Sequence, residues 1–276
     1  MLCQNWIVKD HIKVLAVNHW PEVPIPMGAV ILLPGFSHAM CDMDYFMSRL
    51  ARHLCAKGFF VAQVDLRGHG DGAGEFSDVN LTTLEEDIRL IIEYYRNRIS
   101  DQLFCVGRGL TATLLASFAA DAGLTGIAGI GPYCISPETM QPFSEKMKPD
   151  IFDAYDAFPG DDYVSFSDFD EESLCVLNAL GAVPYNLHGM EMSRRLLNDL
   201  ANLNALHSLR NANCNTLWLF PSQNSDEVNT VSFNKTSFYP GMELFRSSPL
   251  PREPRAQLKF QAVLTDWILD SAYKLN

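Results

Sequence analysis

The chain has 276 residues, 47% of them hydrophobic and 20% charged, which is enough apolar sequence for one large globular domain. Its formal net charge of −12 disfavours nucleic acid and anionic membrane surfaces as partners, because a negative field repels polyanions. No run of 18 apolar residues predicts a membrane-spanning helix, and residues 1–17 lack the layout of a secretory signal.

Seven cysteines are scattered along the chain, with no CxxC pair and no histidine at ligand spacing. This pattern predicts neither a disulfide framework nor a metal site. We therefore expect reduced thiols in the cytoplasm, with no metal and no cofactor.

Apolar runs that end at turn residues predict buried strands. An opening strand or hairpin is expected over 6–17, and further strands at 28–35, 59–66, 103–107, 126–134, 216–222 and 236–241. Helices are predicted over 43–57, 82–98, 110–121, 187–209 and 255–273. This alternation predicts an α/β fold, a doubly wound and mainly parallel sheet.

Two of these helices carry further local expectations. The helix over 82–98 is expected to begin with a threonine cap and a capping box closed by a glutamate, all within 82–86. In the closing helix, we expect the core-facing side to be formed by Leu258, Ala262, Trp267 and Ile268.

Between the strands at 126–134 and 216–222, about 80 residues show no clear strand pattern, far more than an ordinary connection. Residues 138–172 hold 11 carboxylates against two lysines, so −9 of the net charge lies there. A solvated acidic flap is favoured over a cation site, because charge runs are usually solvated faces. We expect a core formed by 1–136 and 213–276, with a helical, acidic cap or lid over 137–212.

Three strings follow successive predicted strands: LPGFSHAMCDMDYF (33–46), DLRGHGDGAG (65–74) and FCVGRGLTATLLA (104–116). Together they resemble the α/β-hydrolase fold family, in particular its monoacylglycerol-lipase and serine-aminopeptidase-like branch. The resemblance implies that the first string is the oxyanion loop and the third the nucleophile elbow. The pocket candidates it implies are Phe36, Ser37, His38 and Leu110.

The elbow departs from the family pattern. Catalysis there needs a nucleophile on a sharp strand-to-helix turn, and this sequence has Gly109 in that position, or Arg108 in the alternative register. Neither side chain can attack a carbonyl. The loop after the last strand, where the family places its histidine, contains none, so Asp226, the one position where a triad residue looks retained, has no imidazole to orient.

Each candidate residue near the elbow has two interpretations. Arg108 either binds an anionic group beside a helix N-terminus or pairs with an aspartate of the flap or turn, and Gly109 is expected to supply a positive φ. Ser37 and His38 could form a relocated dyad, although adjacent residues usually point apart. Cys41 is either an alternative nucleophile or a small buried residue at the start of a helix.

Four further residues have simpler expectations. The resemblance implies that His69 bonds to backbone in its tight turn rather than transferring protons, and Cys105 is expected to lie in the core. Asp226 is either a relic of the triad or a turn-former. Glu243 is either a base or, more simply, an exposed loop carboxylate.

The string GDGAGEFSD (70–78), the following LEED (84–87) and the elbow arginine are similar to hydrolase-like proteins associated with exosortase A and exopolysaccharide loci. Two functions follow from this interpretation. The first is a non-catalytic or atypical binder of an acyl, ester or lipid-like small molecule, linked to exopolysaccharide biosynthesis. The alternative is an atypical acyl or ester hydrolase or acyltransferase that uses Ser37, Cys41 or an activated water. A homodimer or a biosynthetic protein partner is left open.

Overall fold

A computed structural model of the chain describes residues 1–146, 163–165, 171–182, 191–221, 228–231 and 254–274. Four sequence predictions therefore lie outside the described residues, wholly or in large part. They concern the strand at 236–241, most of the acidic stretch 138–172, Asp226 and Glu243.

One eight-stranded sheet runs through the molecule, in the order β1-β2-β4-β3-β5-β6-β9-β10. Its strands are β1 (Leu2–Lys9), β2 (Ile12–His19), β3 (Ala29–Leu33), β4 (Phe60–Asp65), β5 (Leu103–Arg108), β6 (Gly126–Ile130), β9 (Asn215–Pro221) and β10 (Val228–Val231). The five central strands pair in parallel, whereas the outer ones pair antiparallel. The opening segment is the hairpin β1–β2, and the prediction of a mainly parallel sheet is confirmed.

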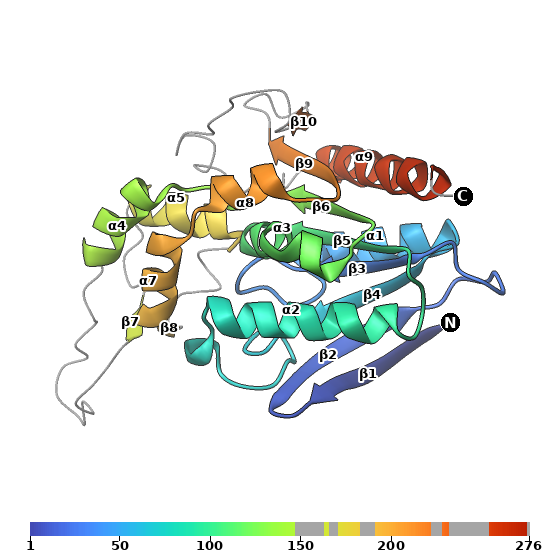
Figure 1. The fold of residues 1–276 in the computed structure, drawn as a ribbon, viewed down its shortest axis with the longest axis horizontal. Helices are drawn as coiled ribbons and strands as arrows, with labels where there is room; N and C mark the ends of the chain where they lie inside the picture. Colours follow the sequence, from blue (N-terminus) through green and yellow to red (C-terminus); the bar gives the residue numbers. More distant parts are fainter. Residues whose placement is uncertain (147–162, 166–170, 183–190, 222–227, 232–253, 275–276) are drawn as a thin grey trace.

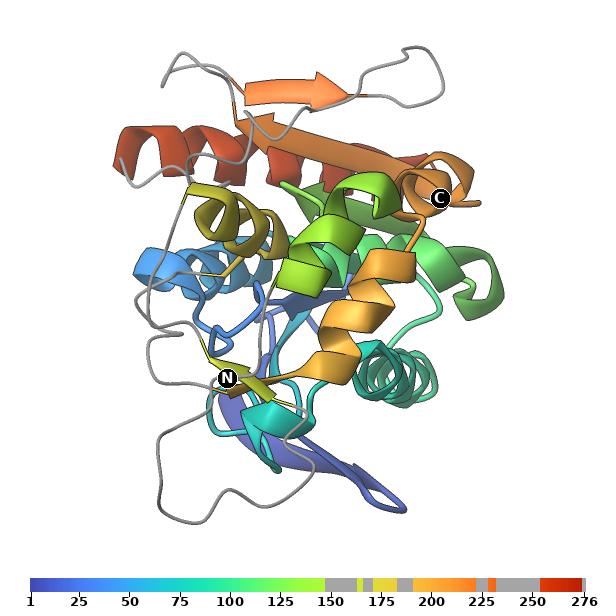
Figure 2. The ribbon, with the colours of Figure 1, turned by 90° about the vertical axis from the view of Figure 1, so that its left-hand side faces the viewer.

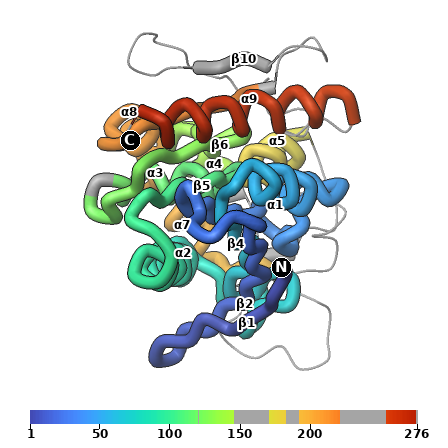
Figure 3. Tube along the Cα trace, turned by 90° about the vertical axis from the view of Figure 1, so that its right-hand side faces the viewer, coloured from blue at the N-terminus to red at the C-terminus, as the bar shows by residue number. Residues whose placement is uncertain are grey.

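Helices cover both faces of this sheet, as the doubly wound prediction requires (Figure 3). Helices α1 (Phe46–Ala56) and α9 (Pro254–Tyr273) cover one face, and α2 (Leu81–Arg96) and α3 (Leu110–Ala122) cover the other (Figure 1). Two buried apolar clusters, one on each face, fill the space between helices and sheet. Among the described residues, no helix is both long and apolar enough to cross a bilayer.

The described parts of the segment between β6 and β9 lie near the carboxyl ends of the parallel strands, as Figure 2 shows. It contains α4 (Pro137–Lys146), β7 (Tyr163–Ser165), α5 (Glu171–Leu180), β8 (Glu191–Ser193), α7 (Arg194–Asn202) and α8 (Ala205–Asn211). Here two expectations are wrong. The short antiparallel pair β7–β8 forms where no strand was expected, and the helix predicted over 187–209 is divided because Asn204 caps α8.

Two local helix predictions are also wrong. Helix α2 begins at Leu81 and is capped by Asn80, two or three residues before the predicted threonine cap, and its capping box is closed by Thr83 rather than by a glutamate. In α9, Leu258 is 58% exposed. Ala262 is exposed as well, but Ile268 is buried as predicted and Trp267 packs against the core. The other buried apolar residues of this face, spaced four positions apart, are Ala256, Phe260, Leu264 and Ala272.

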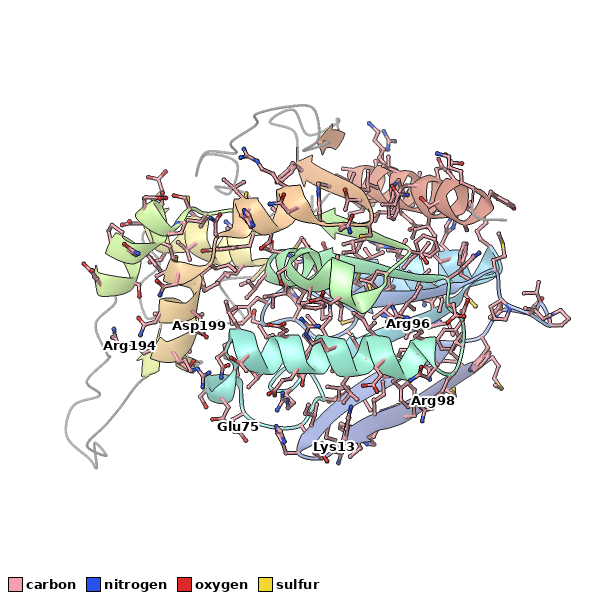
Figure 4. The ribbon with its side chains drawn as sticks, viewed as in Figure 1. Lys13, Glu75, Arg96, Arg98, Arg194 and Asp199 are labelled. Carbon is pink, nitrogen blue, oxygen red and sulfur yellow. The ribbon has the colours of Figure 1, made fainter. Side chains whose placement is uncertain are left out.

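Helix α7 is attached to the core through the start of α2. The Asp199 carboxylate accepts a hydrogen bond from the Leu81 backbone N–H at 3.4 Å, and Figure 4 shows Asp199 on α7 facing this end of α2. Ser193 Oγ donates to the Val79 carbonyl at 3.0 Å. An acidic side chain at a helix N-terminus is favourable because it meets unpaired N–H groups, so these contacts hold the segment after β6 over the strand ends.

Candidate functional site

The turn between β5 and α3 is sharp, and Gly109 makes it. Gly109 has φ 61 and ψ −124, a conformation that strains other residues. Its N–H donates to the Ile130 carbonyl, and its own carbonyl accepts from the Tyr133 N–H, both at 3.1 Å. The positive φ expected for this glycine is confirmed, and the turn is held from both sides.

The space above this turn is filled by backbone. A Cβ built on Gly109 would overlap the Leu180 carbonyl oxygen and lie 2.5 Å from Gly181 N, closer than real Cβ atoms approach. Both residues belong to the end of α5, in the segment between β6 and β9. The position therefore carries no side chain and, in this arrangement, admits none.

Phe36, in the loop after β3, bonds to the same end of α5. Its backbone N–H donates to the Leu180 carbonyl oxygen at 3.3 Å, while its ring lies in the core, 5.6 Å from His69 and 4.9 Å from Phe76 between ring centroids. Leu110, the first residue of α3, is buried directly after the turn. Phe36 and Gly109 thus both lie against one peptide carbonyl, that of Leu180.

Arg108 is enclosed and paired. Its Nε donates to Asp42 Oδ2 at 2.9 Å and its Nη2 lies 2.7 Å from Asp42 Oδ1, with both side chains 0% exposed. Burial disfavours the charged carboxylate, but the Arg108 charge and the hydrogen bonds from Arg108 and the Met43 N–H outweigh it, so the pKa of Asp42 is lowered. The interpretation of Arg108 as half of an ion pair is confirmed, although its partner lies in the loop after β3.

Ser37 and His38 do not form a dyad in the described part of the chain. Neither Ser37 Oγ nor His38 Nε2 has a hydrogen-bond partner there, although both atoms are buried. His38 Nδ1 lies 4.0 Å from Asp42 Oδ1. Burial and the nearby Arg108 charge lower the pKa of His38 to about 4, so the imidazole is neutral at pH 7 and a weak base.

Backbone strain is concentrated in the loop that holds these residues. Ser37, Asp42, Asp44 and Tyr45 all have positive φ values between 51 and 64. Such conformations persist only where surrounding contacts impose them. Asp42 supplies much of that constraint, because its carboxylate also accepts from the Gly35 N–H at 2.9 Å.

Cys41 is half-buried beside this loop, and burial raises the pKa of its thiol. A thiol held in the protonated form is a poor nucleophile. Cys105 lies in β5 and is fully buried, as expected.

The turn after β4 also bonds to the loop after β3. His69 Nδ1 lies 2.9 Å from the Arg67 carbonyl, which confirms the predicted backbone bond. The Asp65 carboxylate accepts from the backbone N–H groups of Met40 and Asp71. These contacts of His69 and Asp65 therefore stabilise the backbone of the loop and of the turn.

Sequence reasoning missed three residues of this site: Asp42, Leu180 and Gly181. Asp42 lies 66 positions from Arg108, and no spacing rule connects them. Gly181, which follows an apolar run, carries the signal of a helix C-cap, but that signal does not say what the cap contacts.

Two other features bear on ligands. Among the described residues, no group of three or more histidine, cysteine, aspartate or glutamate side chains could hold a metal ion. A cavity of about 720 Å³, lined in part by Trp20, Val23, Arg52 and Cys55, lies near the amino end of β4 and away from Gly109.

Comparisons with known proteins agree with this architecture. The family model of the serine aminopeptidases (S33) matches residues 25–152, somewhat less than half of the chain. No curated protein sequence is significantly similar to it.

Solved structures match over much more of the chain. DcsB in complex with its substrate analogue is 14% identical, with a TM-score of 0.65 over 98% of this chain and 100% of that one. The monoacylglycerol lipase of Paleococcus ferrophilus is 15% identical, with a TM-score of 0.60 over 94% and 99%. Est1E from Butyrivibrio proteoclasticus, with ferulic acid bound, is 15% identical, with a TM-score of 0.57 over 78% and 77%. At such identities the likeness shows the fold, which is the expected α/β-hydrolase fold.

Proposed function

We propose that this chain, an α/β-hydrolase fold with glycine in place of the elbow serine, is a non-catalytic or atypical binder of an acyl, ester or lipid-like small molecule. One observation carries the proposal: a peptide carbonyl stands above Gly109, where a nucleophile would need a side chain. Covalent catalysis requires an attacking atom at that point. Recognition of a carbonyl requires only N–H donors such as that of Phe36.

Unpartnered polar atoms support a ligand or water near the elbow. Ser37 Oγ, His38 Nε2 and Arg108 Nη1 are buried and have no hydrogen-bond partner in the described residues. Leaving such an atom unpaired costs about 1–3 kcal/mol. A bound molecule that supplied partners would recover part of this cost.

Three further parts of the proposal rest on weaker support. The names of the solved neighbours, which include a lipase and a protein with ferulic acid bound, favour a small organic ligand. All seven cysteines are free thiols, which favours the cytoplasm. The resemblance of the strings 70–78 and 84–87 to exosortase A-associated proteins supports a link to exopolysaccharide biosynthesis, and we propose 137–212 as the cap.

The alternative, an acyl hydrolase or acyltransferase using Ser37 or Cys41, has less support. Ser37 Oγ has no base within hydrogen-bond distance among the described residues. The Cys41 thiol has a raised pKa. Both observations disfavour an activated nucleophile.

The test is reactivity with a fluorophosphonate probe and with short-chain nitrophenyl esters. We expect no labelling and no turnover above background. Ser37→Ala and Cys41→Ala should change nothing, and Cys55→Ala, another half-buried cysteine with a raised pKa, is the matched control. Labelling or turnover that Ser37→Ala or Cys41→Ala abolishes, and that Cys55→Ala leaves intact, would establish the enzyme instead.

A further inference from the structure

The contact between α5 and the elbow is built for close approach of backbone. Gly109, Gly181 and Gly35 meet there from three separate segments. A Cβ on Gly181 would lie 3.2 Å from the Cα atoms of both other glycines, and a Cβ on Gly35 would overlap the Gly181 carbonyl oxygen. Three glycines at one crossing indicate a specific contact, because any side chain at one of them would separate the segments.

Hydrogen bonding at the end of α5 directs one carbonyl into the elbow. The Leu177 and Asn178 carbonyls accept from the N–H groups of Ala182 and Gly181 at 2.9 and 3.0 Å, as in a glycine-terminated helix. The Leu180 carbonyl accepts from Phe36 N–H instead. The negative end of α5 therefore faces the positive end of α3, an arrangement that stabilises both.

The charges of the described side chains beside this carbonyl cancel one another. Arg108 is matched by Asp42, and both are fully enclosed. His38 carries no charge at pH 7. The described residues offer no unpaired cation to a carboxylate or phosphate in this place, and burial would disfavour such an anion, whereas an uncharged carbonyl oxygen matches what the structure already holds there.

We propose that the Leu180–Gly181 peptide is an internal occupant of the site, and that the ligand is a compound with an uncharged ester or amide carbonyl that displaces it. This inference rests on the proposed binding function. Binding then requires α5 to leave the elbow, so the apparent affinity depends on the fraction of molecules in which the peptide is displaced. The end of α5, at Leu180 and Gly181, therefore competes with the ligand.

Gly181→Ala tests the competition, because the added methyl group meets two backbones and the residue has φ 81. Gly74→Ala is the matched control, since Gly74 has φ 85 and nothing within 4 Å of its built Cβ. The probe is monobutyrin, an uncharged ester, with butyrate as its anionic counterpart. The measurements are calorimetric affinity and hydrogen–deuterium exchange of the peptides that span Phe36 and 171–182.

Without ligand, Gly181→Ala should raise exchange in both peptides, and Gly74→Ala should not. Monobutyrin should bind Gly181→Ala about tenfold more tightly than wild type, and butyrate should bind neither. In wild type, saturating monobutyrin should raise exchange over 171–182 while protecting Phe36, a measurement that needs no variant.

The outcomes separate the two proposals. Equal exchange in Gly181→Ala and Gly74→Ala, or equal monobutyrin affinity in Gly181→Ala and wild type, overturns the internal occupant and leaves the binding function standing. Raised exchange without binding of monobutyrin by any variant overturns the binding function for this ligand class. Tight binding of butyrate overturns the preference for an uncharged carbonyl.

Discussion

Two clusters of arginine, aspartate and histidine lie near the carboxyl ends of the parallel strands, and they differ in how the arginine is shared. The elbow cluster consists of Arg108, Asp42 and His38, and the turn cluster of Arg67, Asp87 and His69. In the elbow cluster, the arginine and aspartate are both 0% exposed and bond to each other. In the turn cluster, the Arg67 side chain is 16% exposed and bonds to Asp87 at 2.6 Å, to Glu86 at 2.8 Å and to the Thr83 carbonyl at 3.0 Å.

The pKa values of the two aspartates are shifted in opposite directions, although each aspartate pairs with an arginine. Burial disfavours the charge on each, but the pKa of Asp42 is lowered because Arg108 outweighs burial, whereas the pKa of Asp87 is raised because burial outweighs Arg67. Arg67 divides its charge between two carboxylates and keeps contact with water. The arginine that is fully enclosed with its aspartate lowers the pKa of that aspartate below its ordinary value, whereas the partly exposed, shared arginine does not.

Removing the arginine of the elbow cluster should have the largest effect. We expect Arg108→Met to lower the free energy of unfolding by about 3–5 kcal/mol, because Asp42 would remain as a buried, uncompensated charge. Chemical denaturation measures the loss. The control is the double variant Arg108→Met with Asp42→Asn, which buries no charge and should recover most of it. A loss below about 1 kcal/mol for the single variant would contradict the importance of the pair.

The histidines of both clusters predict how stability depends on pH. Burial lowers the pKa of both His38 and His69 from 6.5 to about 4. The unfolded chain takes up protons at these positions below pH 6.5, while the folded chain does so only near 4. The stability they contribute is therefore complete above pH 6.5 and is lost as the pH falls towards 4.

His69→Asn isolates one of these contributions. Between pH 6.5 and about 4, the free energy of unfolding should fall in both proteins. The fall should be smaller in the variant, by about 3 kcal/mol. Denaturant titrations across this interval measure it. Burial raises the pKa values of Asp65 and Asp87, so the folded state gains stability from these two groups as the pH falls, opposite to the histidines. Both aspartates are present in the variant and in wild type, so they do not alter the comparison. Identical pH profiles would show that His69 does not titrate as proposed.

Removing the arginine of the turn cluster should have a smaller effect than removing that of the elbow cluster. Arg67→Met should cost about 1.5–3 kcal/mol, the range for hydrogen bonds to charged groups, because Asp87 keeps the Arg67 backbone N–H at 2.8 Å. Lys9→Met is the comparison for an exposed pair, since Lys9 and Glu93 are more than half exposed, and should cost about 0–1 kcal/mol. If Arg67→Met proved as damaging as Arg108→Met, enclosure would not be the deciding factor.

Sequence reasoning succeeded where the information is local. The strand-to-helix turn at Gly109 and the backbone bond of His69 depend on residues within a few positions, and both were predicted. The pairing of Arg108 with Asp42 spans 66 positions, so an aspartate partner could be predicted but its position could not. The approach of Leu180 to Gly109 depends on how α5 packs, which hydrophobic periodicity does not specify.

The crossing of backbones at Gly109 also limits attempts to engineer an esterase from this scaffold. A serine at position 109 would meet the end of α5 before any substrate could reach it. Conversion would require rerouting the main chain near Leu180 and adding an imidazole in the loop before α9. Single-residue replacement is therefore the wrong scale of change, and grafting of whole loops is the practical route.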